Sequence, residues 1–264
     1  MTHPYKCLSY GGGVQSSALL LAACHNDLPE KMRPDVAIFA DTQWEPPSVI
    51  EYVSRMTKYA SDHGLEVVTV SVGSIRTNRG AEQMPLFTKT EDGVKGITSR
   101  HCTYDYKIAP IRQEIRRRLG YEPKQKLKHS IDMWLGISTD EAQRMRTSRE
   151  TNTTNVYPLI EMGWSRESCK RYIEKHDLPL PMKSSCIGCP YHSNRYFLDM
   201  KRERPEEWND VVAFDKQIRS GEFNFGKLRG TPYIHRTAQP LEDVYLNEDQ
   251  IELFGEECSG YCEA

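Results

Sequence analysis

The stretch 5–21 constrains the fold most, because it predicts a β-strand, a glycine turn and an α-helix in direct succession. Three consecutive glycines at 11–13 let the backbone take positive φ angles and bring its N–H groups close together. Ser16 and Ser17 then open a helix whose N-terminus favours anions. The turn therefore predicts a phosphate-binding site. A P-loop kinase or GTPase would need Lys followed by Ser or Thr, and Gln15 argues against that class.

Strands and helices alternate over the first half of the chain. Buried strands are expected at 35–42, 66–72 and 131–138, and a helix at 46–63 connects the first two of these. This alternation predicts an α/β fold with a parallel sheet in three α/β/α layers. Ligands of such sheets bind at the carboxyl ends of the strands, where the glycine turn also falls.

Two domains are expected from the change of pattern along the 264 residues. Residues 1–180 form the nucleotide-binding α/β domain, and 181–264 form a helical and irregular C-terminal extension that carries cysteines. Within the extension, helices are expected at about 194–202 and 205–219. The segment 73–99 is too long for a passive connection and is interpreted as a mobile loop or lid.

Composition narrows the compartment and the partners. A net charge of −2 argues against a surface that is wholly devoted to nucleic acid. The sequence has no apolar run long enough for a bilayer and no leader before the glycine turn, so we expect a cytoplasmic protein without membrane contact. In a reducing compartment the eight cysteines suit metal ligation, catalysis or packing better than disulfides. Cys7, Cys24 and Cys169 are expected to pack in the core.

Three motifs, taken in order, resemble those of one known family. The segment 11–16, with Ser9 just upstream, lies where the family has a Ser-Gly-Gly-x-Asp-Ser loop. The segment 39–42 is similar to the Asp-Thr motif of the family. The segment 136–144 is similar to its later segment with Glu and Arg. The chain thus resembles the PP-loop ATP pyrophosphatases, and among them the phosphoadenosine phosphosulfate (PAPS) reductase-like branch. It departs from the pattern at Gln15, which replaces the usual acidic residue.

The resemblance implies a nucleotide, ATP or an adenylyl sulfate, whose phosphates or sulfate lie on the glycine turn, with Mg²⁺ as an accompanying ion. It implies either adenylation of a substrate oxygen with release of pyrophosphate or reduction of an adenylyl sulfate. A homo-oligomer is expected. The residues expected to bind the nucleotide are Ser9, Gly11, Gly12, Gly13, Gln15, Ser16, Ser17, Asp41, Thr42, Arg100 and Gly136.

Three cysteines form the predicted metal site. Cys186 and Cys189 are spaced as a Cys-x-x-Cys turn, which lets two thiolates point at one metal. The segment around Cys102, with Arg100 and Lys107, resembles the one that supplies cluster ligands in bacterial adenylyl sulfate reductases. Those enzymes carry two adjacent cysteines there, and this chain carries one.

A set of three cysteine ligands resembles the one in the iron-sulfur tRNA thiolation enzymes of the same superfamily. This resemblance implies a 4Fe-4S cluster with one open iron. An open position suits chemistry at a metal, whereas a structural site is closed. A fourth ligand could come from His101, Cys258 or Cys262. Zinc bound by a four-Cys or Cys-Cys-Cys-His set is the alternative.

The tail offers a candidate nucleophile. Glu257 and Cys258 lie close to a glycine and resemble the C-terminal Glu-Cys-Gly motif of PAPS reductases, whose cysteine attacks the sulfonate. A thiolate near arginines would have a lowered pKa and be reactive. Alternatively, Cys258 and Cys262 form a redox or metal-binding dithiol. With Cys258, we take Arg144 and Lys107 as the catalytic residues.

A basic run between Arg112 and His129 could follow the backbone of tRNA or DNA. The net acidic charge fits a solvated helix face and linker better. Three functions therefore stay open: adenylation-linked sulfur transfer, on a nucleic-acid base or another acceptor; PAPS or adenylyl sulfate reduction through Cys258; and nucleotide binding without catalysis beside a structural zinc.

Overall fold

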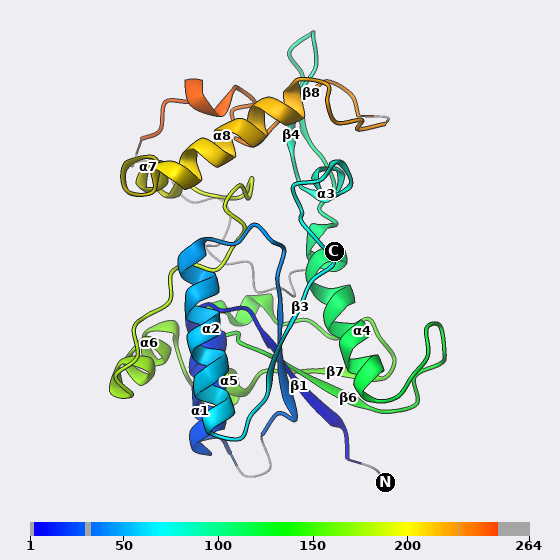
Figure 1. Cartoon of the computed structure of the whole chain (residues 1–264), viewed down its shortest axis with the longest axis vertical. Coiled ribbons are helices and arrows are strands. Elements are labelled where there is room, and N and C mark those ends of the chain that lie inside the picture. Colours follow the sequence, from blue (N-terminus) through cyan, green and yellow to red (C-terminus); the bar gives the residue numbers. More distant parts are fainter. Residues whose placement is uncertain (1–2, 30–32, 227, 248–264) are drawn as a thin grey trace.

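A computed structural model describes residues 3–29, 33–226 and 228–247, and its centre is a five-stranded parallel sheet (Figure 1). The strand order is β3-β2-β1-β6-β7, with β1 at the middle of the sheet. Crossovers between β1 and β2 and between β2 and β3 run through helices, as parallel pairing requires. The strands are β1 Tyr5–Tyr10, β2 Val36–Ala40, β3 Val67–Val70, β6 Ile131–Leu135 and β7 Thr153–Val156.

Helices cover both faces of this sheet and confirm the three-layer α/β/α fold. Alternating side chains of β1 point to opposite faces: Leu8 and Tyr10 belong to one apolar core, and Cys7 belongs to the other. The first core includes side chains of α1, α2, α5 and α6, and the second includes side chains of α4. These helices are α1 Val14–His25, α2 Pro47–Asp62, α4 Ala109–Arg118, α5 Pro158–Glu161 and α6 Arg166–Lys175.

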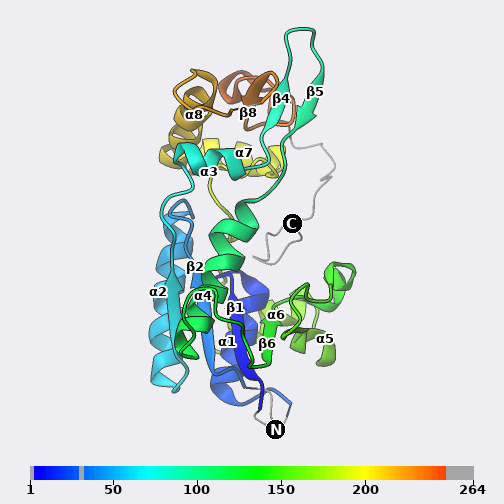
Figure 2. The same cartoon turned by 90° about the vertical axis from the view of Figure 1, so that its right-hand side faces the viewer.

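A second, smaller assembly lies beyond one end of the parallel sheet (Figures 1 and 2). Its antiparallel sheet has the order β5-β4-β8, and its apolar core includes Leu86, Phe197, Phe214 and Ile234. The elements are α3 Asn78–Gln83, β4 Phe87–Lys89, β5 Lys95–Ile97, α7 Asn194–Glu203, α8 Pro205–Arg219, β8 Thr231–Tyr233 and the 3-10 turn η3 Leu241–Asp243.

The segment 73–99, interpreted from the sequence as a mobile loop or lid, is not irregular, because it contains α3 and the β4–β5 hairpin. Its apolar residues Ile75, Met84 and Leu86 are buried, but elements of three to six residues are too short to show a periodic pattern. The segment also contributes to the second core, so contacts cross the predicted boundary at 180. The division into 1–180 and 181–264 stays a prediction.

Two connections complete the described chain. A π-helical turn, η1 Tyr104–Ile108, runs directly into α4, and a 3-10 segment, η2 Thr139–Arg144, follows β6. Strand β7 ends at Val156, and the short helix α5 follows it from Pro158. In the ranges that the structure describes, no helix has the length and apolar character needed to cross a membrane.

Candidate nucleotide and thiol site

The glycine turn lies between β1 and α1 and is tightly packed. Gly12 has a φ of +73°, and a Cβ there would lie 2.9 Å from Val53 Cγ2 of α2, so a side chain would meet both strain and a clash. Ser16 closes the turn from inside the helix: its Oγ accepts from the Gly11 N–H at 3.2 Å. Gly13 is the N-cap and has no side chain to satisfy the first N–H groups of α1. These amides suit an anionic ligand.

The loop after β6 lies directly on the start of α1. A Cβ on Gly136 would be 2.8 Å from the Ser16 backbone nitrogen, so this approach requires glycine. Gln15, which is 1% exposed, donates from Nε2 to Glu141 Oε2 at 3.1 Å. Its Oε1 accepts from Arg166 Nη1 at 3.2 Å. The turn is therefore linked to segments more than a hundred residues away.

Arg144, a predicted catalytic residue, lies in this network. Its Nη1 is 2.8 Å from Glu141 Oε1. Arg166 was not anticipated from the sequence; it is the first residue of α6, directly after the N-cap Ser165. Both guanidinium groups are thus connected through Glu141 and Gln15 to the start of α1.

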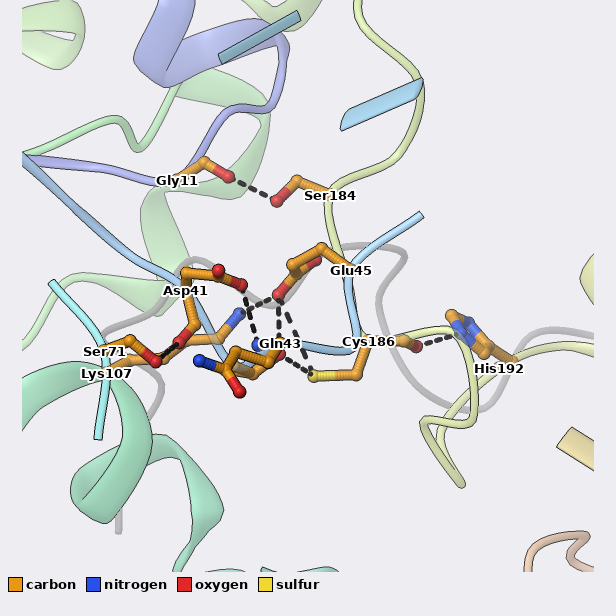
Figure 3. A network of polar contacts seen from close by, with 10 residues as sticks. Gly11, Asp41, Gln43, Glu45, Ser71, Lys107, Ser184, Cys186 and His192 are labelled. Atoms are coloured by element: carbon orange, nitrogen blue, oxygen red, sulfur yellow. Dashed lines mark hydrogen bonds and ion pairs between the residues drawn. The ribbon is translucent and has the colours of Figure 1, made fainter. Parts of the chain in front are cut away.

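The loop after β2 borders a cleft. Asp41 Oδ1 accepts from the Gln43 backbone N–H at 2.7 Å, and the Asp41 carbonyl accepts from the Ser71 hydroxyl (Figure 3). The cleft has a volume of about 750 Å³, a size typical of small-molecule sites. Its lining residues are Asp41, Gln43, Glu45, Pro47, Ile50, Glu51, Ser54 and Arg55.

The Cys-x-x-Cys segment joins both of these loops (Figure 3). Thr42 Oγ1 lies 3.1 Å from Cys186 Sγ, and the Ser184 hydroxyl donates to the Gly11 carbonyl. The Ser185 hydroxyl between them is buried and has no hydrogen-bond partner within the described ranges. One of the predicted metal ligands therefore contacts a predicted nucleotide-binding residue.

Trp44 fixes the segment from the other side. Its carbonyl accepts from the Ile187 N–H at 2.8 Å, and its indole Nε1 donates to Asp210 at 2.7 Å. A Cβ on Gly188 would lie 2.1 Å from the Trp44 ring. The second residue between the two cysteines must therefore be glycine for the turn to lie on this ring.

Lys107 is paired with a buried carboxylate. Its Nζ lies 3.3 Å from Glu45 Oε1, and this same oxygen lies 3.8 Å from Cys186 Sγ (Figure 3). The other oxygen, Oε2, is buried without a hydrogen-bond partner in the part of the chain that is described. Glu45, which the sequence reasoning missed, thus connects a predicted catalytic lysine to a predicted metal ligand.

The three thiols share one buried, partly cationic environment. Burial, together with the Cys189 thiol, raises the pKa of Cys102 to about 11, although Arg100 and Lys107 oppose the rise. Burial likewise raises the pKa values of Cys186 and Cys189. In this fold the thiols are therefore neutral at neutral pH and lack the thiolate character of an activated nucleophile.

The three cysteines are candidate ligands for either a zinc ion or an iron-sulfur cluster. Over the described ranges, no three or more His, Cys, Asp or Glu side chains are grouped so that they could hold a metal ion. The search does not include Cys258 and Cys262, which lie outside the described residues. Thiols beside cationic groups are donors that suit a thiolate-bound metal centre, either an iron-sulfur cluster or zinc.

His192 is a third residue that the sequence reasoning missed. It is buried, and its Nε2 lies 2.9 Å from the Cys186 carbonyl. Burial lowers its pKa to about 3, so the ring is neutral. It also stacks on Tyr196 with ring centroids 3.6 Å apart. The spacing Cys-x-x-Cys-x-x-His was the available signal.

The remaining predicted residues lie in different surroundings. Ser9 and Ser17 are buried, and the Ser17 hydroxyl contacts the Tyr10 hydroxyl at 3.3 Å, so it faces the core. The Arg100 guanidinium lies over the Tyr191 ring at 5.6 Å. Cys7, Cys24 and Cys169 are buried, as expected. The predicted nucleophile Cys258, and Cys262, lie outside the described residues.

The basic run on α4 is largely engaged within the protein. This favours the interpretation as a helix face over the interpretation as a nucleic-acid track. The pairs are Arg112 with Glu150, Arg117 and Arg118 with Glu114, Arg118 with Glu66, and Arg116 with the carbonyls of Glu122 and Gln125.

Comparison with known proteins agrees with this fold. The model of the phosphoadenosine phosphosulfate reductase domain matches residues 6–182. Two solved structures are weakly similar. One is a phosphoadenylyl-sulfate (PAPS) reductase from Candida auris in a phosphate complex, with 16% identity over 68% of this chain and 76% of that one and a TM-score of 0.40. The other is the U34-tRNA thiolase NcsA from Methanococcus maripaludis with its 4Fe-4S cluster, with 14% identity over 82% and 73% and a TM-score of 0.41. The search of curated proteins found no match. Since the domain model covers well over half of its length, the chain belongs to the phosphoadenosine phosphosulfate reductase domain family.

Proposed function

We propose that the chain is a nucleotide-dependent sulfur-transfer enzyme. ATP or a related adenylyl nucleotide binds with its phosphates on the glycine turn, and an oxygen of the acceptor attacks the α-phosphorus, which releases pyrophosphate. A hydrosulfide-level donor then attacks the adenylated carbon; AMP leaves with the oxygen, and a proton is released. The acceptor is a nucleic-acid base or another group that presents an oxygen.

The observation that carries this proposal is the direct contact between the predicted nucleotide loops and the Cys-x-x-Cys segment. Thr42 is 3.1 Å from Cys186 Sγ, and Ser184 bonds to the Gly11 carbonyl. Sulfur held at these thiols would therefore be next to a nucleotide on the turn. Activation and transfer could occur in one site without movement of the acceptor between sites.

Residues of the chain supply the charge stabilisation that adenylation needs. The N-terminus of α1 and the guanidinium of Arg144 suit the negative charge that develops on departing pyrophosphate. Lys107 is held by Glu45 and lies in the electrostatic field of the thiols, where a cation favours their charged form. We propose that Cys102, Cys186 and Cys189 would hold a 4Fe-4S cluster, which would supply the chemistry of a sulfur carrier there.

Reduction of PAPS or adenylyl sulfate is the second candidate, because the family model that matches is that of the PAPS reductase domain. In that reaction the thiolate of Cys258 would attack the sulfur of the sulfonate. The bond between this sulfur and the 5′-phosphate oxygen would break, and the nucleotide would leave with its 5′-phosphate. The two candidates share the glycine turn and differ in the cysteine that reacts.

Calorimetry with ATP, PAPS and adenylyl sulfate tests the shared site and the substrate together. We expect ATP to bind, and no binding of any of the three would contradict the proposal. Anaerobically purified protein should contain iron and absorb broadly near about 400 nm, as thiolate-bound clusters do. Stoichiometric zinc without iron would exclude the cluster.

Cysteine variants separate the candidates. Cys186→Ser should lose the iron, whereas Cys24→Ser, at a buried position on α1, should retain it. Cys258→Ser should retain sulfur transfer. Loss of all activity in Cys258→Ser, with iron and ATP binding retained, would instead support the reductase.

A further inference from the structure

Gln15 is held at both ends of its amide. Nε2 donates to Glu141 Oε2 at 3.1 Å and reaches Ser138 Oγ at 3.5 Å, and Oε1 accepts from Arg166 Nη1 at 3.2 Å. An ionised carboxylate can only accept hydrogen bonds and a guanidinium can only donate them. The two partners therefore need a residue that both donates and accepts, which an amide does and a carboxylate does not.

Among the described residues, this group pairs two arginines with two carboxylates. Arg144 pairs with Glu141 at 2.8 Å, and Asp140 Oδ1 accepts from the Arg166 backbone N–H at 2.9 Å. Burial disfavours the charged form of Asp140, but hydrogen bonds from Ser138 and from the Arg166 backbone outweigh it and lower the pKa of this carboxyl. Two arginines, two carboxylates and a neutral Gln15 thus lie beside the partly positive end of α1.

A carboxylate at position 15 would change this balance. It would face Glu141 across about 3 Å, and like charges at that distance repel strongly in a buried place. The group would also become one unit more negative where an anion has to bind. Because Gln15 is neutral, it adds no negative charge to the site where the anion binds.

We propose that Arg166 is a second anion-binding arginine beside Arg144, and that neutral Gln15 sets the charge of their shared site so that it takes a diphosphate or longer phosphate chain. This inference rests on the proposed function, because it places a phosphate group at the glycine turn. It adds a residue from α6 and assigns a role to the departure at position 15.

Arg166 is well placed for this role. It is half-buried, its backbone is fixed by Asp140 and its guanidinium is oriented by Gln15. An oriented side chain loses less conformational entropy when a ligand binds. The planar guanidinium carries five N–H donors, so it can contact two phosphate oxygens at once, which an ammonium cannot do with the same geometry.

Calorimetry with pyrophosphate and with ATP, both in EDTA, tests Arg166. Arg166→Ala should weaken pyrophosphate binding roughly tenfold or more, as expected for a lost charge-assisted hydrogen bond. Arg171→Ala on the exposed side of the same helix is the matched control and should bind as the wild type does. If Arg166→Ala does not fold by circular dichroism, Arg166→Lys replaces it and should show an intermediate loss. Equal affinity of the Arg166 and Arg171 variants would overturn the assignment.

An exchange of the two side chains tests Gln15. Gln15→Glu should weaken binding roughly tenfold, and the double variant Gln15→Glu/Glu141→Gln should return to within about threefold of the wild type, because one carboxylate and one amide again face each other. Unchanged affinity in Gln15→Glu, or no recovery in the double variant, would overturn the role of Gln15.

Failure of this inference is distinguishable from failure of the proposed function. Pyrophosphate binding that depends on Arg166, without binding of ATP, PAPS or adenylyl sulfate, would refute the proposed function and leave the anion site standing. ATP binding that is the same in Arg166→Ala would refute this inference alone. Absence of all binding would refute both.

Discussion

Gly136→Ala is the sharpest test of the contact between the loop after β6 and the start of α1. Gly136 has no left-handed backbone, so the substitution adds a methyl group without backbone strain. That methyl would lie 2.8 Å from the Ser16 nitrogen and 2.9 Å from its Cα. Ordinary contact begins at 3.4 Å, so the loop has to withdraw by about 0.6 Å. A shift of this size along the 3.1 Å bond between Gln15 and Glu141 takes it beyond hydrogen-bond range.

Two measurements follow from this displacement. Urea unfolding should show a loss of about 1–3 kcal/mol, the usual cost of overpacking. Calorimetry should show roughly tenfold weaker binding of pyrophosphate, because Arg144 and Arg166 lose their common anchor. Gly96→Ala is the control: its Cβ would meet the Thr88 hydroxyl at 3.0 Å, a side chain that can rotate, on the exposed strand β5. Wild-type stability together with wild-type affinity in Gly136→Ala would refute the reasoning.

Three further predictions concern the second assembly and the turn that joins it to the sheet. Asp215 is 1% exposed and accepts hydrogen bonds from two backbone N–H groups at 3.0 Å. In a urea titration, Asp215→Asn should therefore lower the free energy of unfolding by about 2–4 kcal/mol. The exposed control Asp243→Asn should change it little. Burial, with a nearby arginine, lowers the pKa of His235 from 6.5 to about 4, so this histidine contributes stability above pH 6.5 that is lost as the pH falls toward 4. The loss is about 3 kcal/mol, and unfolding at several pH values should give a flatter profile for His235→Gln; an identical profile would contradict the assignment. Gly188→Ala forces a methyl group to 2.1 Å from the Trp44 ring. If the three cysteines hold a cluster as proposed, the purified variant should contain less iron than the wild type, and equal iron content would contradict the need for glycine in this turn.

The parallel sheet and its helices could be predicted because their signals are local. The expected helix at 46–63 is α2 at Pro47–Asp62, and the one at 205–219 is α8 with the same bounds. Each begins with a proline in its first turn, and Ser165 caps α6 by accepting from the Ser168 N–H. Such terminal signals depend on neighbouring residues alone.

The second assembly could not be predicted because its pairings are distant. Strand β4 pairs with β8, although more than a hundred residues separate Phe87 from Tyr233. Each strand has three residues, too few for a visible alternation. A strand of this length is stabilised by its partners and by the core below it, neither of which a local pattern shows.

In the candidate site, too, the local motifs could be predicted from the sequence and the contacts between distant residues could not. The glycine turn and the cysteine spacing were visible, because each is a local motif. The partners of Gln15 were not: Glu141 and Arg166 lie 126 and 151 residues away along the chain. Glu45 had no motif either, since a glutamate near the start of a helix is common on protein surfaces, and its burial beside Lys107 comes from the packing of the π-helical turn η1.

The raised pKa values of the three described thiols bear on which cysteine could attack in a reductase. A reductase needs a thiolate that attacks, and a nucleophilic cysteine has a lowered pKa. Cys102, Cys186 and Cys189 have raised pKa values because burial disfavours their thiolates. They suit ligands, which lose their protons when a metal binds, and they do not suit a free nucleophile. The sulfur-transfer proposal can therefore use the three thiols described here, whereas the reductase proposal depends on Cys258. Activity that survives Cys258→Ser but not Cys186→Ser would follow from the first proposal and contradict the second.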